Sequence, residues 1–221
     1  MRADRLPGVL IETLVTGPFD ENCYLAARAK GRECVIIDPG DEADRIALRM
    51  AELELEPVLI LNTHGHLDHI GAVPALRERF SIPFAIHPGD AFLLQNVNEH
   101  AALFGLSGYS DPQVDREIRG GEVVEAAGLR FAVTEAPGHS PGHVILRVED
   151  EPEVFVGDVV FAGSIGRMDL PGGDEATMKQ TLEQVILTLS DELNLYPGHG
   201  PATTLGHERE HNPYLNGMMR W

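Results

Sequence analysis

A seven-residue segment, THGHLDH at 63–69, constrains this chain more than any other. It directly follows the apolar stretch VLILN, which predicts a buried strand that runs into the segment. Because side chains alternate along extended backbone, His64 and His66 are expected to point the same way. Asp68 and His69 are expected to begin a helix and to project from its first turn toward the same space. Three imidazoles and a carboxylate at a strand end have little packing value, so the segment predicts ligands for two metal ions.

Three further candidate ligands stand at the ends of later strand-like stretches. His139 follows FAVTEA, Asp158 follows EVFVG and His199 follows LNLY. Each could be an ordinary turn residue on its own. An aspartate directly after an apolar strand, however, is a poor core residue unless it is paired or bound to a metal. With the first segment they complete a set of seven, in which an aspartate suits the position between two ions because a carboxylate has two oxygens.

Strand and helix signals alternate along the chain and predict one α/β domain over residues 1–221, with mixed sheets covered by helices. Apolar spacing and turn residues predict the helices, which we expect over 41–55, 71–80 and 174–189, from Asp90 onward, and near 205–211. The segment 95–113 is expected to be an irregular surface excursion that borders the site.

Composition and charge exclude several classes of protein. The formal charge of −18 opposes nucleic-acid binding, and no apolar stretch is long enough to cross a membrane. The N-terminal sequence lacks an apolar run with a small-residue cleavage site, so we expect a cytoplasmic protein without a signal peptide. Cys23 and Cys34 lie in strand-like runs and are expected to be buried thiols, with a disulfide between neighbouring strands as the alternative.

The ordered set HxHxDH, a later His, an Asp and a final His resembles the pattern of the metallo-β-lactamase superfamily. Within that superfamily the chain is most similar to glyoxalase II, the hydroxyacylglutathione hydrolases, in their short bacterial branch. The segments that carry this likeness are 17–19, 22–24, 136–143, 157–161, 163–167 and 196–201. The resemblance implies a four-layer αβ/βα sandwich of two mixed sheets flanked by helices, with the metals between the sheet edges. It implies His64, His66 and His139 on one metal, Asp68, His69 and His199 on the other, and Asp158 bridging both.

The resemblance also implies a dinuclear-metal hydrolase of a small thioester, with S-lactoylglutathione or another hydroxyacylglutathione as the first expectation. Two cations lower the pKa of a shared water and give a bridging hydroxide near neutral pH. Asp68 and Asp158 would act in catalysis through that hydroxide, which attacks a carbonyl polarised by one metal. Histidine and carboxylate ligands suit zinc, iron and manganese, and zinc is our first expectation. The expected partner is the small-molecule thioester, with no nucleic acid and no membrane, and the oligomeric state stays open.

Two other activities of the same fold stay open, a persulfide dioxygenase with one iron and a lactonase. The ending GHGP, in which no aspartate follows His199, favours the hydrolase. The larger glyoxalase II enzymes bind glutathione partly through a C-terminal helical extension, and this chain stops about twenty residues after His199. Arg167 is therefore our candidate for an anionic substrate contact, with a solvated loop arginine as the alternative.

Some residues near these motifs receive weaker interpretations. His143 imitates a helical ligand pair with His139, but Pro141 and Gly142 oppose a helix there, so we expect His143 to support the site without binding metal. Tyr214 and Trp221 either border the substrate cleft or pack in the tail, and packing is our expectation.

Overall fold

The computed structural model describes residues 8–29 and 31–218. Its strands are β1 (Val9–Thr16), β2 (Glu21–Arg28), β3 (Glu33–Ile37), β4 (Glu56–Leu61), β5 (Phe84–Ile86), β6 (Arg116–Glu117), β7 (Val123–Ala126), β8 (Leu129–Glu135), β9 (Val144–Val148), β10 (Glu153–Gly157), β11 (Val160–Phe161), β12 (Ser164–Ile165), β13 (Asn194–Pro197) and β14 (Thr203–Thr204). Its helices are α1 (Ala43–Glu52), α2 (Leu67–Ile70), α3 (Val73–Phe80), α4 (Val97–Ala102), α5 (Glu175–Gln184) and α6 (Leu205–His211), with 3₁₀ turns η1 (Pro88–Asp90) and η2 (Ile186–Thr188).

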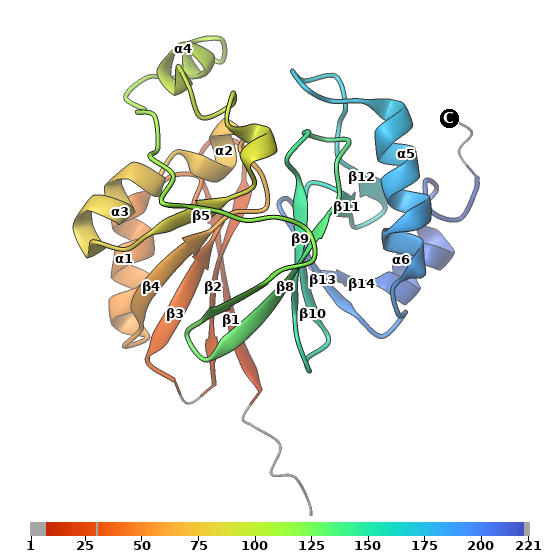
Figure 1. The fold of residues 1–221 in the computed structure, drawn as a ribbon, viewed down its shortest axis with the longest axis horizontal. Coiled ribbons are helices and arrows are strands. Elements are labelled where there is room, and N and C mark those ends of the chain that lie inside the picture. The colour runs from red at the N-terminus through yellow and green to blue at the C-terminus, as the bar shows by residue number, and fades with distance from the viewer. Residues whose placement is uncertain (1–7, 30, 219–221) are drawn as a thin grey trace, which may run out of the picture.

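Two six-stranded sheets form the centre of the molecule. The first has the order β1-β2-β3-β4-β5-β6, antiparallel as far as β3 and parallel from β3 to β6. The second has the order β14-β13-β10-β9-β8-β7, antiparallel except for the parallel pair of β10 and β13. Helices α1 and α3 cover the outer face of the first sheet, and α5 and α6 cover that of the second (Figure 1). The expected sandwich of two mixed sheets flanked by helices is confirmed.

Three apolar clusters correspond to the three interfaces between these four layers. Both faces of strand β2 are covered, and both are therefore apolar. Cys23 and Leu25 pack in the cluster under α1 and α3, while Tyr24 and Ala26 pack between the two sheets. The third cluster holds α5 and α6 against the second sheet. Burying apolar side chains on both faces of each sheet provides most of the driving force for this arrangement.

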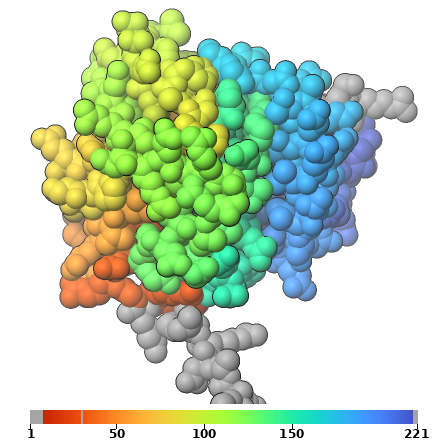
Figure 2. Space-filling view, viewed as in Figure 1, coloured from red at the N-terminus to blue at the C-terminus, as the bar shows by residue number. Residues whose placement is uncertain are grey.

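The segment that follows α4 covers the middle of one face, between the orange and yellow first half and the blue second half (Figure 2). The whole segment 95–113 was expected to be irregular, and α4 at Val97–Ala102 corrects that expectation. The helix forms because Asp111, 14 residues downstream, accepts hydrogen bonds from the backbone N–H groups of Asn96 and Val97 at 3.1 and 2.8 Å. A cap supplied from so far along the chain leaves no local signal at the helix start.

The prediction of a helix from Asp90 onward is also wrong, because the 3₁₀ turn η1 ends at that residue. Asp90 is fully buried, and its carboxylate accepts hydrogen bonds from other segments instead of capping a helix. The two cysteines are buried free thiols, as expected, and Cys34 Sγ lies 3.8 Å from Met50 Sδ. Tyr214 packs against the third cluster, and Trp221 lies outside the described residues. Within the described ranges, no helix has both the length and the apolar character that crossing a membrane requires.

Candidate metal centre

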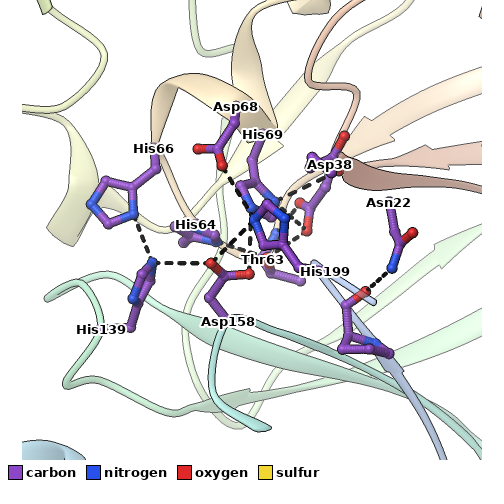
Figure 3. A network of polar contacts seen from close by, with 12 residues as sticks. Asn22, Asp38, Thr63, His64, His66, Asp68, His69, His139, Asp158 and His199 are labelled. Carbon is purple, nitrogen blue, oxygen red and sulfur yellow. Dashed lines mark hydrogen bonds and ion pairs between the residues drawn. The ribbon is translucent and has the colours of Figure 1, made fainter. Parts of the chain in front are cut away.

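All seven predicted ligand residues meet at one edge of the two sheets (Figure 3). The THGHLDH segment leaves β4 and enters α2, while Asp158 follows β10 directly. His139 lies beyond the end of β8, and His199 lies beyond the end of β13. The site is therefore shared between the sheets, and residues more than a hundred positions apart contact one another in it.

The ligand atoms form two groups. Those of His64, His66 and His139 lie within 4.8 Å of one another, and so do those of Asp68, His69 and His199. Asp158 lies between the groups, as the dashed contacts in Figure 3 show. Its Oδ1 is 3.4 Å from Nε2 of His69, and its Oδ2 is 3.4 Å from Nε2 of His139 and 3.6 Å from Nε2 of His199. The carboxylate of Asp158 thus contacts histidines of both sets, which is the placement a bridging ligand needs.

Unpaired polar atoms indicate that the site fits metal ions. Nε2 of His64 and Nε2 of His66 are buried and have no hydrogen-bond partner among the described residues. Nε2 of His69 and Oδ1 of Asp158 are also buried and form an ion pair at 3.4 Å without a hydrogen bond. A buried polar atom without a partner costs about 1–3 kcal/mol, so the two unpaired nitrogen atoms require an explanation. Imidazole and carboxylate atoms arranged in two groups around a shared aspartate fit a dinuclear site for divalent ions.

Backbone carbonyls orient two of the candidate ligands. Nδ1 of His139 donates to the carbonyl oxygen of Arg167 at 2.7 Å, and Nδ1 of His199 donates to that of Phe19 at 3.1 Å. Since a carbonyl can only accept, each bond places a proton on Nδ1 and directs Nε2 into the site. There Nε2 of His139 lies 2.8 Å from Nδ1 of His66, and Nε2 of His199 lies 3.2 Å from Oδ2 of Asp68.

Asp38 performs a related task for His69, and the sequence analysis missed it. Its carboxylate accepts from the backbone N–H and the hydroxyl of Thr63, at 2.7 and 2.6 Å, and its Oδ2 lies 3.2 Å from Nδ1 of His69. Burial lowers the pKa of His69, but Asp158 and Asp38 outweigh burial and raise that pKa well above its usual value. A signal was present, because Asp38 directly follows the apolar strand β3 as Asp158 follows β10.

Asp90 and His143 support the loops that carry the ligands. Asp90 accepts from the backbone N–H of Gly65 at 2.9 Å, from the hydroxyl of Ser140 at 2.7 Å and from the backbone N–H of Gly142 at 2.6 Å. It thereby ties the loop of His64 and His66 to the loop of His139. His143 stacks on the ring of His64, and its Nε2 accepts from the backbone N–H of Asp158 at 3.0 Å.

Electrostatics keep His64, His66 and Asp158 in the forms that bind metals. Burial lowers the pKa of His64 well below its ordinary value and that of His66 to about 3, so both imidazoles are neutral at neutral pH. Burial alone would raise the pKa of Asp158, but His69, His139 and His199 outweigh it and hold that pKa far below its usual range. Neutral imidazole and ionised carboxylate are the ligand forms.

A pocket of about 500 Å³ opens above these residues. Its floor contains residues of both groups, and its wall is formed largely by apolar side chains on either side of the floor. Arg167 lines the pocket, but its guanidinium binds both carboxylate oxygens of Asp169, at 2.6 and 2.7 Å. The structure thus places Arg167 beside the site with its side chain occupied. His100, which the sequence analysis did not single out, also lines the pocket.

Comparison with known proteins agrees with this architecture. The profile of the metallo-beta-lactamase superfamily matches residues 16–209. The hydroxyacylglutathione hydrolase GloC of Haemophilus influenzae is 38% identical over 208 residues, which cover 93% of this chain and 98% of that protein. The crystal structure of BLEG-1, a B3 metallo-beta-lactamase, is 36% identical and superimposes with a TM-score of 0.88 over 94% of this chain and all of that one. The crystal structure of TTHA1623 in a di-iron-bound form is 39% identical, with a TM-score of 0.84 over 92% of this chain and all of that one. The chain therefore belongs to the metallo-β-lactamase superfamily, and it is a metallo-hydrolase of that fold.

Proposed function

We propose that this protein is a dinuclear-metal hydrolase that cleaves small thioesters, and that hydroxyacylglutathiones such as S-lactoylglutathione are the first candidates. The observation that carries the proposal is the placement of Asp158 between two groups of three ligands on the floor of an open pocket. The similarity to GloC, named a hydroxyacylglutathione hydrolase, supports a thioester as the substrate.

The roles of this chain's residues follow from their contacts. His64, His66 and His139 would hold one divalent ion, and Asp68, His69 and His199 the other, with Asp158 shared. Two such ions supply a water acidic enough to react near neutral pH and positive charge beside the substrate carbonyl. Zinc remains our first expectation, and the di-iron form of a similar protein makes iron a direct alternative.

A nucleophilic cysteine does not fit this pocket. Both thiols are buried in the strands, and burial raises the pKa of Cys34 to about 12 and that of Cys23 well above its usual value. Neither residue lines the pocket. The residues on the floor instead bind, orient and charge-balance the reacting groups. A thioester suits such a site because a thiolate leaves without strong protonation.

The experiment is hydrolysis of S-lactoylglutathione by the purified protein, with metal content measured on the same sample. Turnover with about two metals per chain is expected. Turnover absent while two metals are bound would exclude this substrate and direct the search to lactones and other thioesters. One iron per chain, with oxygen consumed when glutathione persulfide is added, would replace the proposal by a dioxygenase.

The variant His66→Ala tests the assignment of the site. Loss of one ligand is expected to lower turnover more than about a hundredfold and to lower bound metal, with the fold retained. His207→Ala is the matched control, because His207 is an exposed histidine on α6 outside the pocket. Wild-type turnover in His66→Ala would refute the metal-hydrolase account.

A further inference from the structure

The wall of the pocket is apolar on both sides of the metal centre. On one side Leu93, Val97, Leu103 and Phe104 come from α4 and its flanking turns, and on the other Ile165 and Leu170 come from the segment that follows Asp158. Helix α4 stands above α2, which carries Asp68 and His69, at the edge of the first half (Figure 1).

Two residues of this wall are poorly covered by the protein itself. Leu103 is 81% exposed and Phe104 is 53% exposed, although both line the pocket. The ring of Phe104 meets the ring of Phe19 edge to face, with centroids 5.4 Å apart. Phe19 in turn accepts the hydrogen bond from His199 through its carbonyl oxygen. The exposed apolar rim is therefore continuous with the residues that orient the metal centre, and a substrate in the pocket would cover it.

Cationic groups for a charged thiol carrier are scarce in this pocket. Among the described residues that line it, Arg167 is the one arginine or lysine, and Asp169 already binds its guanidinium through two oxygens. Glutathione carries two carboxylates and one ammonium group at neutral pH. The chain as a whole has a formal charge of −18, so long-range electrostatics do not attract an anionic carrier either.

We propose that the preferred substrate is a thioester with an uncharged apolar group of several carbons, which lies along the wall formed by Leu93, Val97, Leu103 and Phe104. This inference rests on the proposed thioester hydrolysis and ranks a neutral apolar thioester above the hydroxyacylglutathiones as the preferred substrate. The reaction is unchanged: the C–S bond breaks, a C–O bond forms with the oxygen of water, and the products are a carboxylic acid and a thiol. The apolar group belongs either to the acyl part or to the thiol, and the two sources are distinguished by experiment.

The test uses the metal-loaded protein and two substrate series. In the first, N-acetylcysteamine carries acyl groups from acetyl to octanoyl. In the second, the lactoyl group is carried by glutathione, N-acetylcysteamine and hexanethiol. If the acyl part contacts the wall, we expect kcat/KM in the first series to rise by about threefold per added methylene. If the thiol contacts the wall, we expect kcat/KM in the second series to be highest with hexanethiol. A rise in the first series places the apolar group on the acyl side, and a rise from N-acetylcysteamine to hexanethiol places it on the thiol side.

A matched pair of leucine variants tests the wall itself. Leu103→Ser is expected to lower kcat/KM about tenfold for the longest favoured substrate and to change that for the shortest by less than twofold. Leu48→Ser is the control, because Leu48 is 61% exposed on α1 and does not line the pocket. Binding of S-octyl-N-acetylcysteamine to the metal-free protein, measured by calorimetry, should weaken in Leu103→Ser and not in Leu48→Ser.

The outcomes separate this inference from the proposed function. Hydrolysis of S-lactoylglutathione that exceeds hydrolysis of every neutral thioester would overturn the apolar preference and leave the thioesterase standing. Equal effects of Leu103→Ser on short and long substrates would also overturn it. Absence of turnover with all thioesters, in protein that holds two metals, would overturn the proposed function and this inference with it.

Discussion

Replacing Asp90 by asparagine is a direct test of how the metal-binding loops are held. The side chain is fully buried and accepts three hydrogen bonds, two through Oδ2 and one through Oδ1. An asparagine of the same shape keeps one oxygen, so its NH₂ group must face at least one donor. If the oxygen occupies the Oδ2 position, the backbone N–H of Gly142, now 2.6 Å from Oδ1, loses its acceptor.

The magnitude follows from two opposing effects. A hydrogen bond to a charged acceptor contributes about 1.5–3 kcal/mol, and an unpaired buried donor adds about 1–3 kcal/mol of cost. Burial raises the pKa of Asp90, which its three donors only partly offset, so removing the charge recovers part of that cost. We therefore expect Asp90→Asn to lower the free energy of unfolding by about 2 kcal/mol. Because the lost contacts join the loop of Gly65 to that of Ser140, metal affinity should fall roughly tenfold to a hundredfold.

Urea unfolding of the metal-free protein and a competitive metal titration measure the two effects separately. Asp111→Asn is the matched control, because Asp111 also accepts two backbone N–H bonds but is exposed and lies at α4. It should cost less than about 1 kcal/mol and leave metal affinity within about twofold. A variant Asp90→Asn with wild-type stability and wild-type metal affinity would refute the role assigned to this carboxylate.

Three further changes have defined outcomes. Gly198→Ala should abolish activity and lower metal content, because its Cβ would lie 2.1 Å from Oδ1 of Asp158, the carboxylate shared by both ligand groups. Gly8→Ala, with nothing within 4 Å of the added Cβ, should leave turnover and metal content unchanged. Arg77 hydrogen-bonds Asp115 and lowers the pKa of that carboxyl in the folded protein. The ion pair therefore stabilises the fold fully above the pKa of about 3.9 that the carboxyl has in the unfolded chain. This stabilisation is lost as the pH falls through the lower pKa of the folded protein. Asp115→Asn should thus lower the free energy of unfolding by up to about 1 kcal/mol at pH 7 and by almost nothing near pH 2, as measured by urea unfolding. An equal decrease at the two pH values would contradict this account. Removing metal with a chelator should lower the wild-type Tm by roughly 5 °C or more, because ions that bind only the folded chain stabilise it, and an unchanged Tm in calorimetry would exclude that coupling.

The sequence predicted the fold and the convergence of seven side chains for a physical reason. Histidines and aspartates directly after apolar strands have few structural uses, so His64, Asp158 and His199 stand out from their surroundings. Asp38 and Asp90 did not, although both are buried beside the site. Their partners are backbone N–H groups and two hydroxyls 25 to 52 residues away, and such pairs leave no local pattern. Arg167 is the opposite case, because its partner Asp169 lies only two residues further along the chain and could have been noticed in the sequence.

The site lies on the junction of two halves that each fold around their own sheet. Asn22 of the first half donates to the carbonyl oxygens of Pro197 and Gly200 at 2.9 and 2.8 Å, and the hydroxyl of Tyr24 donates to that of Pro197 at 2.5 Å. Beside them Glu21 forms a β-bridge with His199. These few bonds set the distance between the histidines of one half and Asp158 of the other. Ions held by both halves would reinforce the same junction, so metal binding and the docking of the two sheets should stabilise each other. The geometry of the site therefore depends on contacts between the halves, which no single stretch of sequence contains.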